Sequence, residues 1–278
     1  MPFFESAHAR LHYQLEGADD APVLMLSNSL GTHLGMWAPQ MPSLLSHFRV
    51  LRYDARGHGQ SSVPDGPYSI AQLGADAIAL IDHLRLDRVH FCGLSMGGMT
   101  GLWLALNHAA RIDRLVLCNT AARIGPPEMW DVRIEAVLAQ GLAAIVPAVL
   151  DRWFTRDFRH GATAQVELVR AMLQTTTDAG YVASCAAVRD MDQRGQLGAI
   201  SVPTLVIAGR QDMATPPADG RFLADHIAGA RYVELNAAHL SNWEVAQAFT
   251  MHVCDFLLDQ DQGPARRQSQ NQGSKENG

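Results

Sequence analysis

The residues best suited to chemistry form a short glycine-rich segment around one serine, Gly93-Leu94-Ser95-Met96-Gly97. The segment fits the pattern G-x-S-x-G, follows a strand-like apolar run at 88–93, and precedes a stretch of helical character. A serine in a sharp strand-to-helix turn is presented as a nucleophile, and flanking glycines let the two elements pass closely. The pattern alone also arises by chance, so its setting is what favours a nucleophilic Ser95 over an ordinary glycine-rich turn.

A serine hydroxyl needs a base to take its proton and an acid to orient that base. After a nucleophile in such a turn, the acid and then a histidine are expected later in the chain, each just beyond a strand. Asp212 follows the apolar run at 203–209, and His239 follows the run at 231–237. Among the 12 histidines, only His239 lies between the last expected strand and the last expected helix. We therefore predict a triad of Ser95, Asp212 and His239; an ordinary turn carboxylate is the alternative reading of Asp212.

Cleavage of an ester also requires two N–H donors for the oxyanion of the tetrahedral intermediate. The backbone N–H of Met96 is the expected first donor, because it follows the nucleophile at a helix start, where the helix dipole adds to its effect. The glycine-bearing loop SNSLGTHLGMW follows the strand expected at 22–29, and its Leu30 is the expected second donor. His33, His58 and His90 lie near other strand ends and are expected to be structural or to contact the site.

The rest of the chain predicts the elements that position these residues. Mainly apolar runs of strand length, of the kind buried on both faces of a sheet, occur at 22–29, 48–54, 88–93, 113–120, 203–209 and 231–237. Helical patterns alternate with them, and two begin with capping-box spacing, at Ser69 with Gln72 and at Ser241 with Glu244. This alternation predicts an α/β fold with a mostly parallel sheet of about eight strands flanked by helices. Residues 3–17 instead predict two antiparallel strands at one edge.

The chain also divides into regions of different character. Residues 1–121 and 198–258 carry the alternating pattern and predict the α/β core. Residues 122–197 show only helical patterns, which indicates a helical lid inserted between two strands, because the segment is too long for a simple connection. The polar tail at 259–278 is nearly free of apolar residues and is predicted to be disordered.

Composition excludes several classes of function. The net charge of −6 argues against a nucleic-acid partner, and the sequence contains no apolar run of membrane-spanning length. The four cysteines are widely spaced, which predicts buried free thiols in a reducing compartment. The first residues carry no secretory pattern, so a cytoplasmic enzyme is expected. No cluster has metal-ligand spacing, no cofactor is expected, and the oligomeric state stays open.

Five segments together resemble a known family: SNSLGTHLGMW, YDARGHGQS, GLSMGG, AGRQD and AAHLSNWE. They are similar to the α/β-hydrolase fold over about 2–258. Within it, LCNTAARIG, CAAVRDMD and the SNSLG segment, which stands where many relatives have a His-Gly pair, are most similar to the 3-oxoadipate enol-lactonases of the β-ketoadipate pathway of aromatic breakdown. The resemblance implies a Ser95–Asp212–His239 triad, an oxyanion hole formed by Leu30 and Met96, and lactone hydrolysis without metal or cofactor.

The implied substrate is a small anionic lactone, whose carboxylate needs a cation or several N–H donors. Arg133, with Trp130 three residues earlier, is the expected binding residue, although a solvated Arg133 and a Trp130 that only packs the lid fit the pattern equally well. Two other functions stay open. One is a different small-ester hydrolase or a cofactor-free perhydrolase of this fold. The more distant one is a non-enzymatic ligand receptor, which a broken triad would have favoured.

Overall fold

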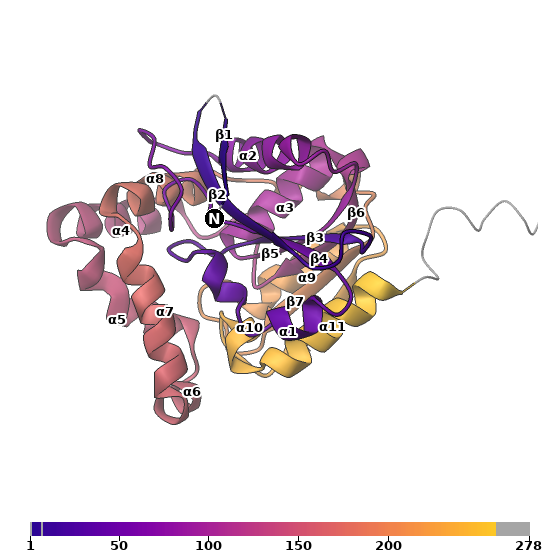
Figure 1. Ribbon diagram of the computed structural model, residues 1–278. Coiled ribbons are helices and arrows are strands. Elements are labelled where there is room, and N and C mark those ends of the chain that lie inside the picture. Colours follow the sequence, from indigo (N-terminus) through magenta and orange to yellow (C-terminus); the bar gives the residue numbers. More distant parts are fainter. Residues whose placement is uncertain (1, 7, 260–278) are drawn as a thin grey trace, which may run out of the picture.

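The computed structural model describes residues 2–6 and 8–259. Their strands form one eight-stranded sheet (Figure 1). The strand order is β1-β2-β4-β3-β5-β6-β7-β8. The strands are β1 (Phe3–Glu5), β2 (Arg10–Glu16), β3 (Val23–Ser27), β4 (Arg49–Tyr53), β5 (Val89–Leu94), β6 (Ile112–Cys118), β7 (Thr204–Gly209) and β8 (Arg231–Leu235). The pairs β1–β2 and β2–β4 are antiparallel and the others are parallel, so the expected parallel sheet with an antiparallel edge is confirmed.

Helices cover both faces of this sheet. Alternate residues of the strands supply two apolar cores, as the two-residue period of a strand requires. One core packs beneath α2 (Ile70–His83), α3 (Met96–Asn107) and α9 (Pro217–His226), and the other packs beneath α1 (Met41–Leu44) and α11 (Ala246–Leu258). The sequence predicts that the strand β8 is buried on both faces, but its residues are mostly half-buried. The reason is that β8 is the last strand of the sheet beside β7 and has a strand neighbour on one side only.

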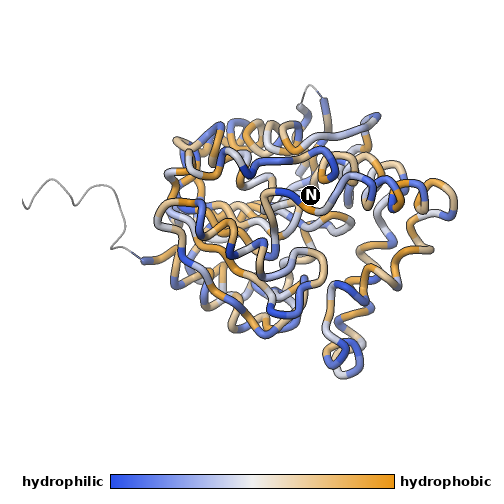
Figure 2. Tube along the Cα trace, turned by 180° about the vertical axis from the view of Figure 1, so that it is seen from behind, coloured by the Kyte–Doolittle hydropathy of each residue, from blue (hydrophilic) through white to orange (hydrophobic). Residues whose placement is uncertain are grey.

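The region between β6 and β7 contains helices and no strand in the described chain. These helices are α4 (Pro127–Gln140), α5 (Leu142–Trp153), α6 (Arg156–Gly161), α7 (Thr163–Thr175) and α8 (Asp178–Arg189). They lie together beside the sheet in Figure 1, and in Figure 2 their trace changes repeatedly between hydrophobic and hydrophilic residues. Their apolar faces extend both cores, with Trp130 and Tyr181 in one and Val146 and Val149 in the other.

The two expected capping boxes have different outcomes. At Ser69 the box is confirmed, because its side chain accepts from the Gln72 N–H and the Gln72 side chain accepts in return. The expectation at Ser241 is wrong, since this segment forms a separate short helix, α10 (Ser241–Glu244), and the long helix starts after it. The Ser241 hydroxyl donates to Asn119 Oδ1 at 2.6 Å, so a distant partner replaces the local one.

Two further sequence predictions concern the chain as a whole. All four cysteines are buried and free, as expected. The predicted disorder of the tail concerns residues that, after Asp259, lie outside the described part of the chain. Among the described helices, none combines the length and the apolar character needed to cross a membrane.

Candidate active site

Ser95 lies in a sharp turn between β5 and α3. Its backbone has φ 57° and ψ −117°, a left-handed conformation that costs a non-glycine residue about 1–3 kcal/mol. A Cβ at Gly93 would come within 2.2 Å of the Gly97 carbonyl oxygen, and one at Gly97 within 2.2 Å of the Ser27 carbonyl oxygen. Only glycine fits at these two positions, which explains the spacing of the G-x-S-x-G segment.

Neighbouring strands hold the strained turn in place. The Ser95 N–H donates to the Cys118 carbonyl at 2.9 Å, at the end of β6. The Thr120 hydroxyl donates to the Ser95 carbonyl at 2.7 Å. These bonds come from a different strand end, so the position of the serine depends on the sheet and not on the turn alone.

Asp212 and His239 meet beyond the ends of β7 and β8. The His239 Nδ1 lies 2.9 Å from Asp212 Oδ2, and both side chains are almost completely buried. Because a carboxylate can only accept, Nδ1 carries the proton, and Nε2 is left with a lone pair that can accept a proton. The structure therefore places this pair in the arrangement that a general base requires.

The Asp212 carboxylate is fixed by further donors. Its Oδ1 accepts from the N–H groups of Ala214 at 2.8 Å and Thr215 at 2.9 Å. Its Oδ2 also accepts from the Thr215 hydroxyl at 2.8 Å and from Asn119 Nδ2 at 3.0 Å. Burial acts to raise the pKa of Asp212, but His239 and these hydrogen bonds outweigh it and lower the pKa. The carboxylate therefore stays ionised.

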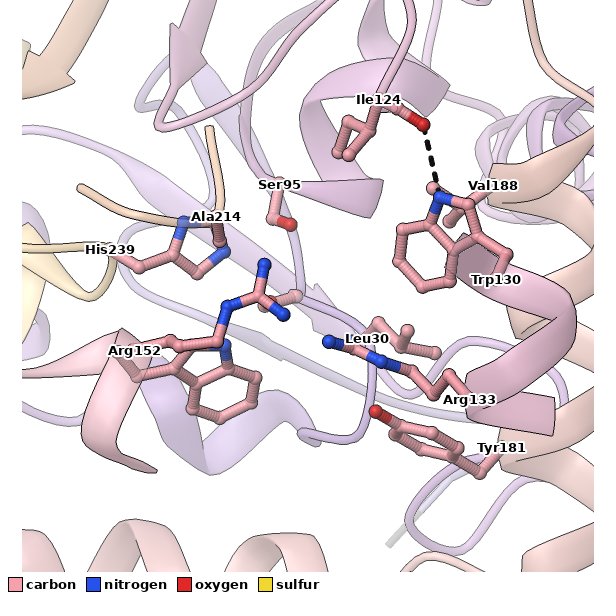
Figure 3. A pocket seen from close by; sticks show the side chains of 12 residues that line it. Leu30, Ser95, Ile124, Trp130, Arg133, Arg152, Tyr181, Val188, Ala214 and His239 are labelled. Atoms are coloured by element: carbon pink, nitrogen blue, oxygen red, sulfur yellow. Dashed lines mark hydrogen bonds between the residues drawn. The ribbon is translucent and has the colours of Figure 1, made fainter. Parts of the chain in front are cut away.

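Ser95 and His239 line one cavity of about 30 Å³, together with Leu30, Arg133 and Arg152 (Figure 3). The hydrogen bonds of the described residues include none from the Ser95 hydroxyl to His239. Such bonds are often long without substrate and tighten when it binds. A cavity of this size holds little more than a water molecule. A larger substrate therefore requires lining side chains to move.

Leu30 and Met96 are the two residues whose backbone N–H groups are expected to donate to the oxyanion. Leu30 lines the cavity, and Met96 is the first residue of α3, where a backbone N–H has no acceptor inside the helix. The Leu30 loop is anchored by His58, whose Nε2 accepts from the Gly31 N–H at 2.8 Å. Its Nδ1 lies 3.1 Å from the Arg56 carbonyl, so Nδ1 carries the proton. Burial lowers the pKa of His58, which keeps Nε2 available as the acceptor.

Two arginines from neighbouring helices face each other across the cavity. Arg133 on α4 and Arg152 on α5 point their guanidinium groups into the same space, near Ser95 and His239 (Figure 3). Both are half-buried, and neither forms an ion pair with a carboxylate of the described residues. Burial and the charge of Arg133 lower the pKa of Arg152. An anion in the cavity would relieve that repulsion and receive donors from two sides.

Much of the remaining cavity wall is aromatic. The Arg133 guanidinium lies 4.9 Å from the centre of the Trp130 ring, so these two predicted residues do contact each other. Trp130 Nε1 donates to the Ile124 carbonyl at 3.0 Å, which fixes the ring. Tyr181, on α8, points its hydroxyl toward Arg133 in Figure 3, and burial raises its pKa strongly. The wall is therefore apolar with charge concentrated at two points.

A half-buried carboxylate joins the segment between α5 and α6 to the loop of His239. Glu244 accepts from the Ala238 N–H at 2.7 Å and from the Thr155 N–H between α5 and α6. The Trp153 carbonyl accepts from the Leu240 N–H at 3.1 Å. Burial raises the pKa of Glu244. The residues on both sides of His239 are thus attached to the same helical region that carries Arg152.

Sequence reasoning missed Arg152, Asn119 and Thr215. Thr215 lies three residues after Asp212, and its hydroxyl could have been recognised as a local partner of the carboxylate. Asn119, at the end of β6, adopts φ 44°, and its position after a buried strand was an available signal. No local signal marks Arg152, because only the packing of α4 against α5 brings it to Arg133. Within residues 2–6 and 8–259, no group of three or more His, Cys, Asp or Glu side chains is arranged to hold a metal ion.

Comparison with known proteins agrees with the fold. The family model described as alpha/beta hydrolase fold matches residues 22–246. The chain therefore belongs to the α/β-hydrolase family, and the enol-lactonase relatives described next make it a carboxylic-ester hydrolase.

The most similar relatives include two proteins from Acinetobacter baylyi. The chain is 46% identical to 3-oxoadipate enol-lactonase 2 over 89% of its own length and 92% of the relative's. It is 41% identical to 3-oxoadipate enol-lactonase 1 with the same coverage of both chains. The crystal structure of the enol-lactonase from Burkholderia xenovorans LB400 is 50% identical, with a TM-score of 0.90 over 93% of this chain and all of that one.

Proposed function

We propose that this protein hydrolyses 3-oxoadipate enol-lactone to 3-oxoadipate, a step in the breakdown of aromatic compounds. The observation that carries the proposal is the pair Arg133 and Arg152, two cations without carboxylate partners among the described residues, in the cavity that contains Ser95 and His239. A lactone with a carboxylate arm matches the charges of this cavity, because its anion meets both guanidinium groups while its ring lies near the serine, once lining side chains have moved to admit it. The enol-lactonase relatives support the same substrate.

The proposed reaction uses Ser95 as nucleophile, His239 as base and Asp212 as the residue that orients His239. As Ser95 Oγ attacks the lactone carbonyl, His239 Nε2 takes the hydroxyl proton, and the carbonyl oxygen becomes an oxyanion. The N–H groups of Leu30 and Met96 donate to this oxygen. The intermediate then breaks the ring C–O bond, and the protonated His239 Nε2 gives its proton to the leaving enolate oxygen. The enol formed in this way becomes a ketone when its O–H loses the proton and its carbon gains one, and His239 is again free to act as a base.

The second half of the reaction releases the product. A water molecule gives its proton to His239 as it attacks the acyl carbon, and the bond to Ser95 Oγ breaks with return of that proton to the serine. The helices of residues 122–197 are the proposed lid, because α4 and α5 supply both arginines to the wall of the cavity that contains Ser95.

The test compares an anionic lactone with an uncharged ester. Replacing Arg152→Gln or Arg133→Gln removes charge-assisted hydrogen bonds worth about 1.5–3 kcal/mol. We expect kcat/KM for the enol-lactone to fall by about 10- to 150-fold, and kcat/KM for para-nitrophenyl acetate to change by less than about threefold. Arg170→Gln, at an exposed ion pair on α7, is the matched control and should change neither.

The two outcomes separate this function from other hydrolases of the fold. The proposal is supported if the wild-type enzyme turns over the lactone preferentially and both arginine variants lose kcat/KM on the lactone alone. If the wild-type enzyme turns over uncharged esters as well as the lactone, and the arginine variants keep their kcat/KM on the lactone, a general small-ester hydrolase or a perhydrolase is favoured instead.

A further inference from the structure

Ser29, in the loop before Leu30, has a hydroxyl without a partner among the described residues. The residue is 1% exposed and lines the cavity with Ser95 and His239, and its hydroxyl makes no hydrogen bond with the described residues. Leaving a buried polar group unpaired costs about 1–3 kcal/mol. The hydroxyl therefore has a cost for folding that no contact within the described protein offsets.

The backbone of Ser29 is held without this hydroxyl. The Ser29 carbonyl accepts from the Thr32 N–H at 3.1 Å and from the Thr32 hydroxyl at 2.8 Å. The Ser29 N–H lies 3.2 Å from Met36 Sδ. These contacts set the loop geometry through main-chain atoms, so anchoring of the loop does not explain the side chain.

The position of the hydroxyl indicates what it serves. Ser29 shares a peptide bond with Leu30, whose N–H is the proposed oxyanion donor, and both residues face the cavity of Ser95. We propose that the Ser29 hydroxyl is a third oxyanion donor, acting beside the N–H groups of Leu30 and Met96. The inference rests on the proposed hydrolytic function of this site.

In this role the hydroxyl donates to the substrate carbonyl oxygen as that oxygen becomes negatively charged. A donor whose hydrogen bond is weak to the neutral carbonyl oxygen and strong to the oxyanion raises kcat and leaves KM nearly unchanged. Loss of one principal oxyanion donor costs about 10²–10³ in kcat. With two backbone donors still in place, we expect loss of this third donor to cost about 10- to 100-fold.

The experiment measures kcat and KM of Ser29→Ala on the enol-lactone and on para-nitrophenyl acetate. Ser184→Ala is the matched control, because Ser184 on α8 is also fully buried with an unpartnered hydroxyl but does not line the cavity. Both variants remove an unpaired buried hydroxyl, so the melting temperature should stay the same or rise in both. Only Ser29→Ala should lose kcat, by about 10- to 100-fold on both substrates.

A second measurement separates oxyanion binding from altered packing. Trifluoroacetone forms a tetrahedral adduct with an active serine and places an oxyanion in the same position. Its inhibition constant should weaken in Ser29→Ala by about the same factor as kcat. Ser29→Gly removes the same hydroxyl and should give the same result, which covers the case in which the alanine variant folds poorly.

Each alternative outcome overturns the inference. An unchanged kcat in Ser29→Ala would do so, as would a rise in KM alone, which indicates binding of the substrate ground state. Loss of kcat without weaker inhibition by trifluoroacetone would also contradict it. If the wild-type enzyme cleaves the aryl ester but not the lactone, the proposed substrate fails, while the ester kinetics still decide the role of Ser29.

Discussion

Asp212→Asn is the substitution that tests the proposed general base most sharply, because it leaves the shape of the site nearly unchanged. The single amide oxygen is expected to remain where Oδ1 lies, since it faces the Ala214 and Thr215 N–H groups, which can only donate. The amide NH₂ then takes the place of Oδ2, 2.9 Å from His239 Nδ1. It donates to that nitrogen, so the imidazole proton moves to Nε2, which can no longer accept a proton from Ser95.

The expected loss follows from this change of tautomer. An orienting carboxylate replaced by its amide costs about 10⁴ in kcat in a serine triad, which corresponds to about 5 kcal/mol of activation free energy. The assay is steady-state turnover of the enol-lactone, with circular dichroism to show that the variant is folded. Asp219→Asn is the matched control, because Asp219 is half-buried in the first turn of α9 and makes no hydrogen bond to His239. It should keep kcat within about threefold. A folded Asp212→Asn enzyme with a tenth of wild-type kcat would refute the reasoning.

Two further predictions concern residues that support the site. Asn119→Gly removes the side chain that donates to Asp212, and glycine adopts the φ of 44° without strain, so the effect on stability reports the lost hydrogen bonds. We expect the free energy of unfolding in urea to fall by about 1–3 kcal/mol. An unchanged denaturation midpoint would contradict this expectation. His58 has a folded pKa below 6.5, so the unfolded state binds more protons and stability falls as pH drops below about 6.5. His58→Gln keeps an acceptor for Gly31 that does not titrate; its melting temperature should fall less between pH 6.5 and 5 than that of wild type, and equal losses would count against this role of His58.

Local sequence patterns were sufficient to predict the main helices and strands and the site residues that directly follow strands. The turn at Ser95 was predictable because its constraints lie within a few residues, where glycine alone fits at 93 and 97. Positions just after buried strands located Asp212 and His239, because the carboxyl ends of parallel strands meet at one edge of the sheet. The structure brings these two side chains together and places Ser95 in the cavity that His239 lines, while the catalytic roles of all three residues stay predictions.

Contacts between distant segments could not be predicted in this way. Arg152 reaches the cavity only because α5 packs beside α4, and nothing in the sequence around it marks that meeting. The capping box expected at Ser241 failed for a related reason, since its hydroxyl donates to Asn119, which lies just after β6 in a distant part of the chain. Glu244 likewise binds backbone N–H groups of two separate segments, at Ala238 and Thr155, instead of the local helix.

The most direct test of the account is turnover of 3-oxoadipate enol-lactone by the wild-type protein and by Ser95→Ala, measured side by side. The account predicts rapid hydrolysis by wild type and a loss on the order of 10⁶ in kcat in the variant, with the folded structure retained. Failure of the wild-type enzyme to open the lactone would contradict the proposed substrate. A folded Ser95→Ala enzyme that kept a tenth of wild-type turnover would contradict the proposed nucleophile.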